Sequence, residues 1–427
     1  MLGGEAGTVS KPALEAAVTE NRRQPEHPRG TAGQAGAFLL VALNLRIAIA
    51  AVSPVLGDIQ RDTGLTSGAA GLLTTIPIVC FGVFAFGTPR LTRRFGGHRL
   101  LLLAMLLLAG GITLYLQPSV PALFAATLVT GAAIAVGNVL LPGVIKRDFV
   151  SRAGLMTGLY SMTLSAGAAL AAGLTIPLRT ATGLGWRDVL ALWAVPAVLA
   201  AAACAPRALR TRPRLAPASG ATTAPRLGAL WRDPVAWAVT VFMGLQSLGY
   251  YALLAWLPTL FQDHHMAAGQ AGWMLSFSSF PAMAAALAMP AIERRLRRPQ
   301  AAVVAAVLLC AVGYLGLLAD PVPLSYLWMT ALGLGQGAAI SLALGYIVAR
   351  SPDHAHTGQL STMAQGTGYL IACVGPLGLG LLHSATGSWT VPILALTAVL
   401  AIELIAGLLA SRDRHVLAPR RPDGSGS

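Results

Sequence analysis

The chain has few charged residues for its length. Asp, Glu, Lys and Arg make up 11% of its 427 residues, and aromatic residues 6%, whereas a soluble domain carries about 25% charged residues. The sequence therefore excludes an ordinary soluble domain. Cysteine is also scarce. The four thiols lie inside apolar segments without the spacing of a metal site or a disulfide framework, and we interpret them as packing residues: Cys80, Cys204, Cys310 and Cys373.

Motifs that carry catalysis are missing as well. The sequence has no phosphate-binding loop, no HExxH pair, no nucleophile elbow and no paired carboxylates within an apolar segment. Two clusters, Asp263-His264-His265 and His354-Ala355-His356, contain metal-ligand residue types. Both lie between apolar segments, where solvated loop residues are the simpler interpretation and metal binding is the alternative. We therefore predict no cofactor and no metal, and an enzyme has little support.

Long apolar runs are what the chain has in abundance. Hydrophobic residues make up 55% of the sequence, and its mean hydropathy is +0.66. A helix needs about 20 apolar residues to cross a bilayer. Twelve such windows lie near residues 36–57, 68–89, 99–117, 121–145, 153–176, 187–205, 235–261, 270–292, 300–319, 322–349, 358–383 and 390–410. The predicted fold class is an all-α polytopic membrane protein with twelve transmembrane helices.

Basic residues are distributed unevenly around these spans. The net charge of +14 comes from 30 Lys and Arg against 16 Asp and Glu, a balance that nucleic-acid-binding proteins also show. Threading the spans with both termini on one side places 26 of the 30 basic residues there and only Arg61, Arg179 and Arg187 on the other. Such asymmetry is typical of the cytoplasmic side. We predict a bacterial inner (plasma) membrane protein with both termini cytoplasmic, in contact with anionic lipid and with no nucleic-acid partner.

The spans form two groups of six that repeat one another weakly. Matches at an offset of 204 residues are Pro54 with Pro258, Pro77 with Pro281, Arg90, Arg93 and Arg94 with Arg294, Arg297 and Arg298, and Ala181-Thr182-Gly183 with Ala385-Thr386-Gly387. Gly158 and Gly167 match Gly366 and Gly375 at an offset shifted by a few residues. Single matches could arise by chance in a chain rich in Ala and Gly, but four at one offset are harder to explain that way. Two parallel six-helix halves around a midplane substrate site resemble the major facilitator superfamily.

This repeat gives the predicted domain organisation. We expect a disordered cytoplasmic N-terminal tail (1–35), an N-terminal six-helix bundle (36–205), a basic cytoplasmic linker (206–234), a C-terminal six-helix bundle (235–410) and a cytoplasmic C-terminal tail (411–427). The first 35 residues lack an apolar core and a cleavage-site pattern, so we expect no signal peptide. The first span would itself direct insertion.

Arg46 is the main functional candidate, because it lies near the middle of an otherwise uncharged span. A charge at that depth is costly, and arginine does not lose its proton to escape the cost. It must face a wet cavity, a carboxylate or an anion from outside. The repeat pairs Arg46 with Tyr250, since each lies eight residues before its half's proline, Pro54 or Pro258. We predict that the two form a clamp for a small, flat, polar or anionic ligand; the alternative is that Arg46 pairs with an acid and only holds the bundle together.

Helical spacing sorts the other polar residues. Gln246 lies one turn before Tyr250, and Gln365 one turn before Tyr369, so each pair shares a face. Further substrate-binding candidates are Asn44, Asn138, Gln336 and Tyr160. Asn44 projects about 200° away from Arg46 by helix geometry, so a helix contact is the alternative for it. Interhelical hydrogen bonds are the alternative for the amides of Asn138 and Gln336, and lipid contact for Tyr160.

Glu403 is the one acid well inside a predicted span. The twelfth helix is usually peripheral in this fold class, which favours packing or snorkelling over proton transfer. Uniport, exchange and proton symport all stay open.

Several of these segments together are similar to the cyanate/2-nitroimidazole transporter (CynX/NimT) family of the major facilitator superfamily. The segments are Asn44-Leu45-Arg46, Gly137-Asn138-Val139-Leu140-Leu141-Pro142, Ile145-Lys146-Arg147-Asp148, Gly158-Leu159-Tyr160-Ser161, Gly185-Trp186-Arg187, Tyr251-Ala252-Leu253-Leu254-Ala255-Trp256-Leu257-Pro258, Met363-Ala364-Gln365-Gly366 and Ala385-Thr386-Gly387. The resemblance covers essentially the whole membrane domain. It implies a secondary transporter of small, often anionic or nitrogen-rich solutes that works by rocking of the two halves.

One superfamily signature is degraded. The loop after the second span keeps Arg94 and Gly96, but Pro89 replaces a glycine and Arg93 replaces the usual aspartate. The resemblance therefore does not carry over the charge lock of the cytoplasmic gate. We name Arg93, Arg94 and Asp148 as gating candidates, with Asp148 as the substitute contact.

The predicted function is secondary active transport by a monomer with a small-molecule substrate. A drug exporter of the same fold is the alternative within transport. A membrane sensor or scaffold would need an added soluble domain, which the sequence does not contain.

Overall fold

A computed structural model of the chain describes residues 32–65, 67–210 and 227–417. In these residues the fold is built from helices alone. Eleven of them are long and apolar enough to cross a membrane, and a pair bent by 60°, Thr75–Ala85 with Thr88–Phe95, makes a twelfth span. The predicted twelve-helix fold is confirmed.

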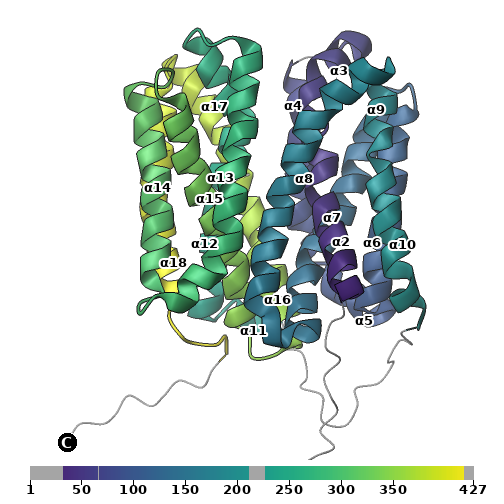
Figure 1. Cartoon of the computed structure of the whole chain (residues 1–427), viewed down its shortest axis with the longest axis vertical. Helices are drawn as coiled ribbons and strands as arrows, with labels where there is room; N and C mark the ends of the chain where they lie inside the picture. The colour runs from purple at the N-terminus through teal and green to yellow at the C-terminus, as the bar shows by residue number, and fades with distance from the viewer. Residues whose placement is uncertain (1–31, 66, 211–226, 418–427) are drawn as a thin grey trace, which may run out of the picture.

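The N-terminal half contains the first six spans (Figure 1). Its helices are α2 (Ala32–Ala50), α3 (Leu56–Thr63), α4 (Ser67–Ala85), α5 (Thr88–Phe95), α6 (Gly97–Thr113), α7 (Val120–Asp148), α8 (Ala153–Thr182), α9 (Trp186–Leu192) and α10 (Ala194–Arg210), with short 3₁₀ turns at Ser53–Val55, Leu114–Leu116 and Val150–Arg152.

The C-terminal half follows the same plan. Its helices are α11 (Leu227–Leu230), α12 (Pro234–Asp263), α13 (Ala268–Arg295), α14 (Gln300–Ala319), α15 (Ser325–Ala349), α16 (His354–Ala372), α17 (Val374–Thr386) and α18 (Thr390–Ala410). Several helix starts are capped by a side chain. Asp233 and Asp353 each accept two backbone N–H groups, and such a cap is worth about 1 kcal/mol.

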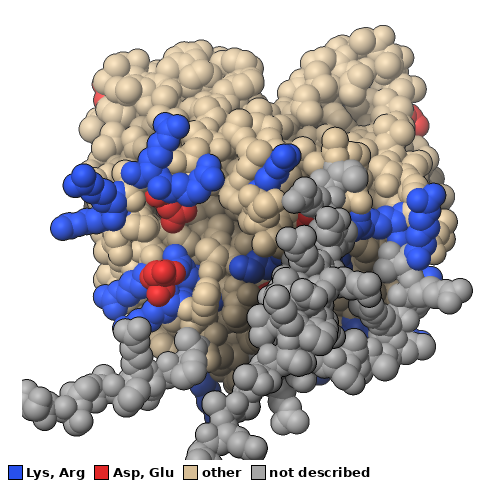
Figure 2. Space-filling model, turned by 60° about the horizontal axis from the view of Figure 1, so that its bottom comes forward, with Lys and Arg blue, Asp and Glu red and all other residues tan. Residues whose placement is uncertain are grey.

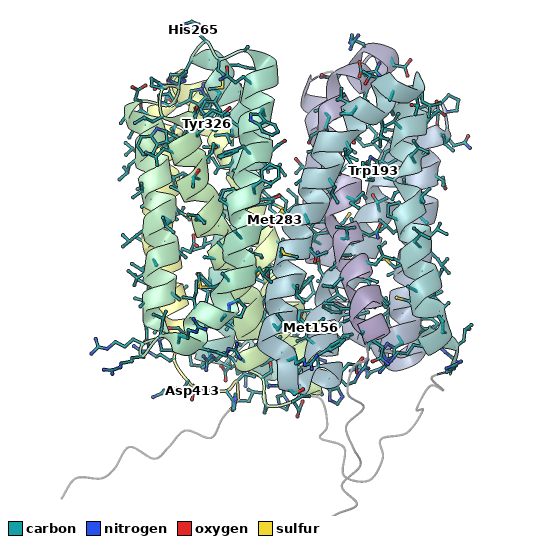
Figure 3. The ribbon with its side chains drawn as sticks, in the orientation of Figure 1. Met156, Trp193, His265, Met283, Tyr326 and Asp413 are labelled. Atoms are coloured by element: carbon teal, nitrogen blue, oxygen red, sulfur yellow. The ribbon has the colours of Figure 1, made fainter. Side chains whose placement is uncertain are left out.

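Both described ends of the chain lie at one end of the bundle, which we call the basal end; the other is the distal end. Figure 3 marks the two ends with Asp413, at the basal end, and His265, at the distal end. Figure 2 shows Lys and Arg gathered toward the basal end. Leucines on the outer faces, such as Leu103, Leu308 and Leu381, are exposed, as expected of a surface that faces lipid.

Four spans are broken where the sequence predicted continuous helices. The second bends between α4 and α5, and the first, sixth and eleventh are interrupted near Val52, Trp193 and Cys373. At the basal end α2 begins at Ala32 and α10 runs through Pro206 to Arg210, beyond the predicted bounds of 36 and 205. Hydropathy locates only the apolar part of a helix, so the predicted spans did not include these polar helix ends. The predicted tails and linker lie mainly outside the described residues.

Two kinds of contact occur at corresponding positions of both halves, as the sequence repeat predicts. A Cβ at Gly167 would lie 2.3 Å from the carbonyl oxygen of Leu43, and one at Gly375 would lie 2.7 Å from that of Leu248. Only glycine permits these approaches of α8 to α2 and of α17 to α12. At the distal end, the indole N–H of Trp186 donates to Asp62 and that of Trp389 to Asp263. The two halves are therefore built on one template.

The halves meet through α8 with α13 and α15, and through α16 with α4, α5 and α7. The tight contacts lie toward the basal end. A Cβ at Gly158, near the basal start of α8, would lie 3.0 Å from the carbonyl oxygen of Leu287. The side-chain amide of Gln365 donates to the backbone oxygen of Asn138 at 2.5 Å. Toward the distal end the two lobes separate, and Figure 2 shows the notch between them at its upper edge.

Candidate functional site

Arg46 lies deep in the bundle and connects the two halves. It is fourteen residues, or about 21 Å of helix, from the basal start of α2, and only 8% of it is exposed. Its Nη1 donates a hydrogen bond to the hydroxyl of Tyr251 on α12. Its Cζ atom is 5.5 Å from the ring centroid of Tyr250 and 5.4 Å from that of Tyr251, within the range of cation–π attraction.

Four tyrosines surround this guanidinium. Besides Tyr250 and Tyr251, the hydroxyl of Tyr369 on α16 interacts with Arg46, and the buried Tyr160 on α8 is a further electrostatic neighbour. The rings support one another, because Tyr251 packs edge-on against Tyr250 and Tyr369 with centroids 5.1 and 6.3 Å apart. Neutral hydroxyls and ring faces stabilise the cation but leave its charge uncompensated.

A cavity of about 50 Å³ opens beside Arg46 between the halves. It is lined from the N-terminal half by Arg46, Ser161, Leu164 and Ser165, and from the C-terminal half by Gln246, Ser247, Tyr250, Ser278, Ser279, Ala282, Gln336, Gly337 and Ile340. Of these lining residues, all in the described part of the chain, Arg46 alone carries a charge. A second cavity of about 60 Å³ shares four of them, Tyr250, Ser278, Ser279 and Gln336, and continues past Ala50, Ser53 and Leu257 toward the distal end.

Close packing of α13 against α15 forms the wall opposite Arg46. A Cβ at Gly337 would lie 2.1 Å from the carbonyl oxygen of Ala282, so glycine is required for this approach. It brings the side chain of Gln336 to the cavity. Met283, next to Ala282, lies at mid-height of the bundle in Figure 3, which places the cavity near the membrane midplane.

Hydroxyl and amide groups complete the lining. The Nε2 of Gln246 donates to the backbone oxygen of Met243 and to Ser247 Oγ, at 3.0 and 2.6 Å, and the side chain lines the cavity. The side-chain amide of Gln336 is buried and interacts with the hydroxyl of Tyr314 on α14. The five serines of the cavity lining were not among the predicted residues, because a lone serine in an apolar helix usually bonds its own backbone. Ser161 and Ser278 indeed do so, with Thr157 and Leu275.

Some predicted residues lie elsewhere. Asn44 donates to the backbone oxygens of Leu40 and Pro196, so it joins α2 to α10 and does not line the cavity, as its projection away from Arg46 suggested. Gln365 bonds to Asn138 and to Ser361 Oγ, which makes it a contact between α16 and α7 instead of a cavity residue. Tyr160 is fully buried, with its ring against Phe38 at 5.8 Å. Its lipid-facing alternative is therefore wrong.

The gating candidates lie at the basal end, and within the described part of the chain the pairs that they form are with other residues and not with one another. Asp148 is buried and pairs with Arg147 at 2.7 Å and Arg207 at 3.4 Å, all within the N-terminal half. Arg93 lines a cavity of about 300 Å³ between α5, α7 and the start of α16. Arg94 is exposed, with its Cζ 5.4 Å from the ring centroid of Phe95. Only Arg93 faces the other half here.

Glu403 is buried on α18, beside Cys310 and Tyr314 of α14. It lies inside the C-terminal half and lines neither central cavity. The snorkelling interpretation is wrong, because the side chain packs inward.

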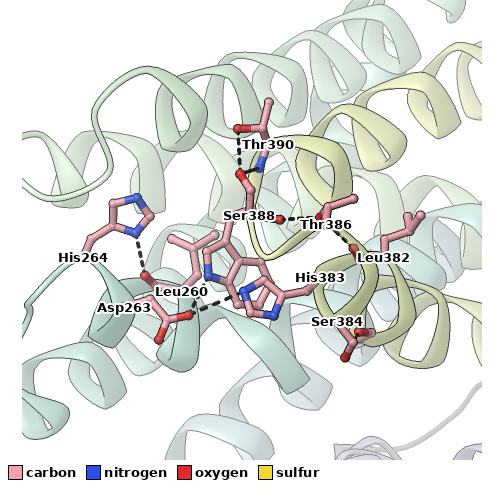
Figure 4. A network of polar contacts seen from close by, with 11 residues as sticks. Leu260, Asp263, His264, Leu382, His383, Ser384, Thr386, Ser388 and Thr390 are labelled. Atoms are coloured by element: carbon pink, nitrogen blue, oxygen red, sulfur yellow. Dashed lines mark hydrogen bonds and ion pairs between the residues drawn. The ribbon is translucent and has the colours of Figure 1, made fainter.

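The histidines near the distal end belong to a structural network (Figure 4). Asp263 accepts from the indole of Trp389 at 2.8 Å and lies 3.7 Å from His383, whose ring stacks on that indole. His264 instead contacts the backbone oxygen of Leu260. In the described residues no three His, Cys, Asp or Glu side chains group as a metal site.

The lining of the central cavity is polar on several sides. It offers one fixed cation, hydroxyls and amides between apolar walls. Such a site attracts an anion or a ring with acceptor atoms, and orients it by hydrogen bonds.

The chain is similar to known proteins over most of its length. Residues 38–267 and 244–426 match the family model of the Major Facilitator Superfamily. The chain is 37% identical to an uncharacterized transporter, YycB, of Bacillus subtilis (91% of this chain and 96% of that one), 35% to the 2-nitroimidazole transporter of Escherichia coli (89% and 95%), and 33% to its cyanate transport protein CynX (82% and 90%). Among solved structures, the human organic anion transporter MFSD10 superposes with a TM-score of 0.68 at 16% identity, covering 90% of this chain and all of that one.

Proposed function

We propose a substrate from the premise that the chain belongs to the cyanate/2-nitroimidazole transporter family of the major facilitator superfamily and is a secondary transporter of small solutes. This substrate is a small, flat, anionic or nitrogen-rich molecule bound by Arg46. The observation that carries this proposal is the buried guanidinium that lines a midplane cavity with no acid beside it. The names of two relatives, for cyanate and 2-nitroimidazole, describe solutes of this kind.

The size of the cavity supports a small solute over a drug. A water molecule needs about 10–15 Å³ by this measure, so 50 Å³ holds about three to five waters. Drug-sized ligands occupy pockets of about 300–1,000 Å³. The exporter alternative would need a much larger cavity at Arg46 than this state offers.

We assign roles within the site as follows. Arg46 binds the negative or acceptor-rich edge of the substrate, and Tyr250, Gln246 and Gln336 contact it from the C-terminal half. Tyr251 and Tyr369 hold Arg46 in place. Since one chain encloses the whole cavity, the monomer is the transporting unit.

A binding experiment tests the substrate class. With purified protein, cyanate and 2-nitroimidazole should raise the apparent melting temperature, because a ligand of the folded state stabilises it by about 2.7 kcal/mol at 100 times its Kd. Choline, a cation of similar size, should not. The proposal would be contradicted if choline alone raised the melting temperature, or if neither cyanate nor 2-nitroimidazole raised it.

The proposed orientation places the basal end in the cytoplasm of a bacterial cell, with the protein in the inner membrane. Basic residues gather at that end (Figure 2), as the positive-inside rule requires. The central cavity leads toward the distal end, so this is an outward-facing state of an alternating-access cycle.

Cysteine labelling checks this orientation. In a variant without the four native thiols, a cysteine at exposed His415 should react with a membrane-impermeant maleimide only after the cells are opened. One at exposed His264 should react in intact cells. Labelling of both positions from one side would show that the span map is wrong.

A further inference from the structure

The charge balance at the centre of the molecule is uneven. Arg46 is 8% exposed and has tyrosine hydroxyls and ring faces as its partners. The acids of the spans nearest to it are used elsewhere. Asp58 pairs with Arg61 and Arg179 at the distal end, and Asp148 pairs with Arg147 at the basal end.

The other acids of the spans do not reach the site either. Asp62, Asp188 and Asp263 are exposed at the distal end, and Glu293, near the basal end of α13, interacts with Tyr346 and Arg350. The last of these acids is Glu403. It is buried between α18 and α14 and lines neither of the central cavities. Within the described chain, the empty site therefore carries one unpaired positive charge, and a bound monoanion would bring it to zero.

This balance affects the step in which the site changes sides. Between its two open states a carrier must pass through an occluded state, where the cavity loses contact with water on both sides. Enclosing an unpaired ion in an apolar bundle is costly, and enclosing a paired one much less so. From this charge balance we propose that the protein works as an anion exchanger, because its loaded form reorients much faster than its empty form. The inference rests on the proposed anion binding by Arg46.

The contacts of Arg46 fit this role. A guanidinium has five N–H donors in a planar fork. The tyrosine hydroxyls of the C-terminal half, Tyr251 and Tyr369, take part of this capacity, and the rest is free to bind an anion in the cavity. A bound anion thus neutralises the site without breaking the bond from Arg46 to Tyr251 that joins the halves.

Radiolabelled cyanate in proteoliposomes tests the proposal. Initial uptake should be at least about tenfold faster into vesicles that contain saturating unlabelled cyanate than into vesicles without it, which corresponds to about 1.4 kcal/mol of barrier. Liposomes without protein measure the passive leak of the conjugate acid. Equal rates under the two conditions would overturn the exchange mechanism. Absence of both binding and uptake would instead contradict the proposed function.

Membrane potential gives an independent readout. The loaded site is neutral and the empty site is positive, so an interior-negative potential, set with potassium and valinomycin, should slow the outward return of the empty site. Net uptake should therefore fall while exchange stays unchanged. An equal effect on both would contradict the assignment of charge to the two forms.

Two substitutions at Arg46 separate charge from affinity. Arg46→Lys keeps the positive charge, so at saturating cyanate its ratio of exchange to net uptake should stay high even if binding weakens. Arg46→Gln removes the charge, so its ratio should fall toward one. Glu403→Gln is the matched control, because Glu403 lies outside the cavity, and it should keep the wild-type ratio. If Glu403→Gln lowered the ratio of exchange to net uptake, or if Arg46→Gln kept it high, the charge of Arg46 would not be the cause of the slow return of the empty form.

Discussion

Arg46→Lys protein is expected to fold and reach the membrane, but to bind a flat anion one to two orders of magnitude more weakly. Lysine keeps the charge but loses the planar fork that can hold Tyr251 and an anion at once. A hydrogen bond to a charged group contributes about 1.5–3 kcal/mol, and each 1.4 kcal/mol is about tenfold in Kd. Isothermal titration of purified protein with cyanate measures the change directly.

The matched control is Arg61→Lys. Arg61 also pairs through its guanidinium, with Asp58, but its side chain is 80% exposed at the distal end, and its substitution should leave Kd unchanged. Unaltered affinity in well-folded Arg46→Lys protein would leave Arg46 as a structural residue. Misfolding of this variant would indicate the same, because it would show that the tyrosine contacts, and not a ligand, require the guanidinium.

Hydropathy was sufficient to predict the fold, because the bilayer imposes a length on every span. The internal repeat could also be detected in the sequence. The matched glycines Gly167 and Gly375 make the same close approach to a neighbouring carbonyl in each half. The bend between α4 and α5 and the break near Cys373 could not be predicted, because they depend on packing between helices and leave apolar composition unchanged.

A site residue could be predicted only where its burial in a membrane span is energetically costly. Arg46 was evident from its charge alone. Its hydrogen-bond partner is Tyr251, whereas the repeat pointed to the neighbouring Tyr250, which lines the cavity. Adjacent tyrosines project about 100° apart on an α-helix, yet both rings lie close to the guanidinium, and a sequence offset does not resolve which hydroxyl bonds to it. Gln365 shares a face with Tyr369, but a bond across the halves to Asn138 takes up its amide.

Gly158→Leu should abolish most transport by preventing the basal end from closing. Gly158 is buried where α8 crosses α13, and a Cβ there would lie 3.0 Å from the carbonyl oxygen of Leu287 and 3.2 Å from Cγ of Pro290. A whole leucine side chain must therefore push the two halves apart. Overpacking costs about 1–3 kcal/mol, which is enough to depopulate the basally closed state by about fivefold to 150-fold.

Two measurements check this expectation together. Uptake of labelled cyanate should fall by at least about fivefold. A cysteine at Ala355, in the basal cavity between the halves, should react faster with an impermeant thiol reagent from the basal side. Gly173→Leu is the matched control, since Gly173 lies on the same helix with nothing within 4 Å of a Cβ. Gly158→Ala, with a smaller intrusion, should show a weaker form of both effects. Wild-type uptake and wild-type labelling in Gly158→Leu would mean that the halves can close without this contact, and that the basal seal depends on α16 with α4 and α7.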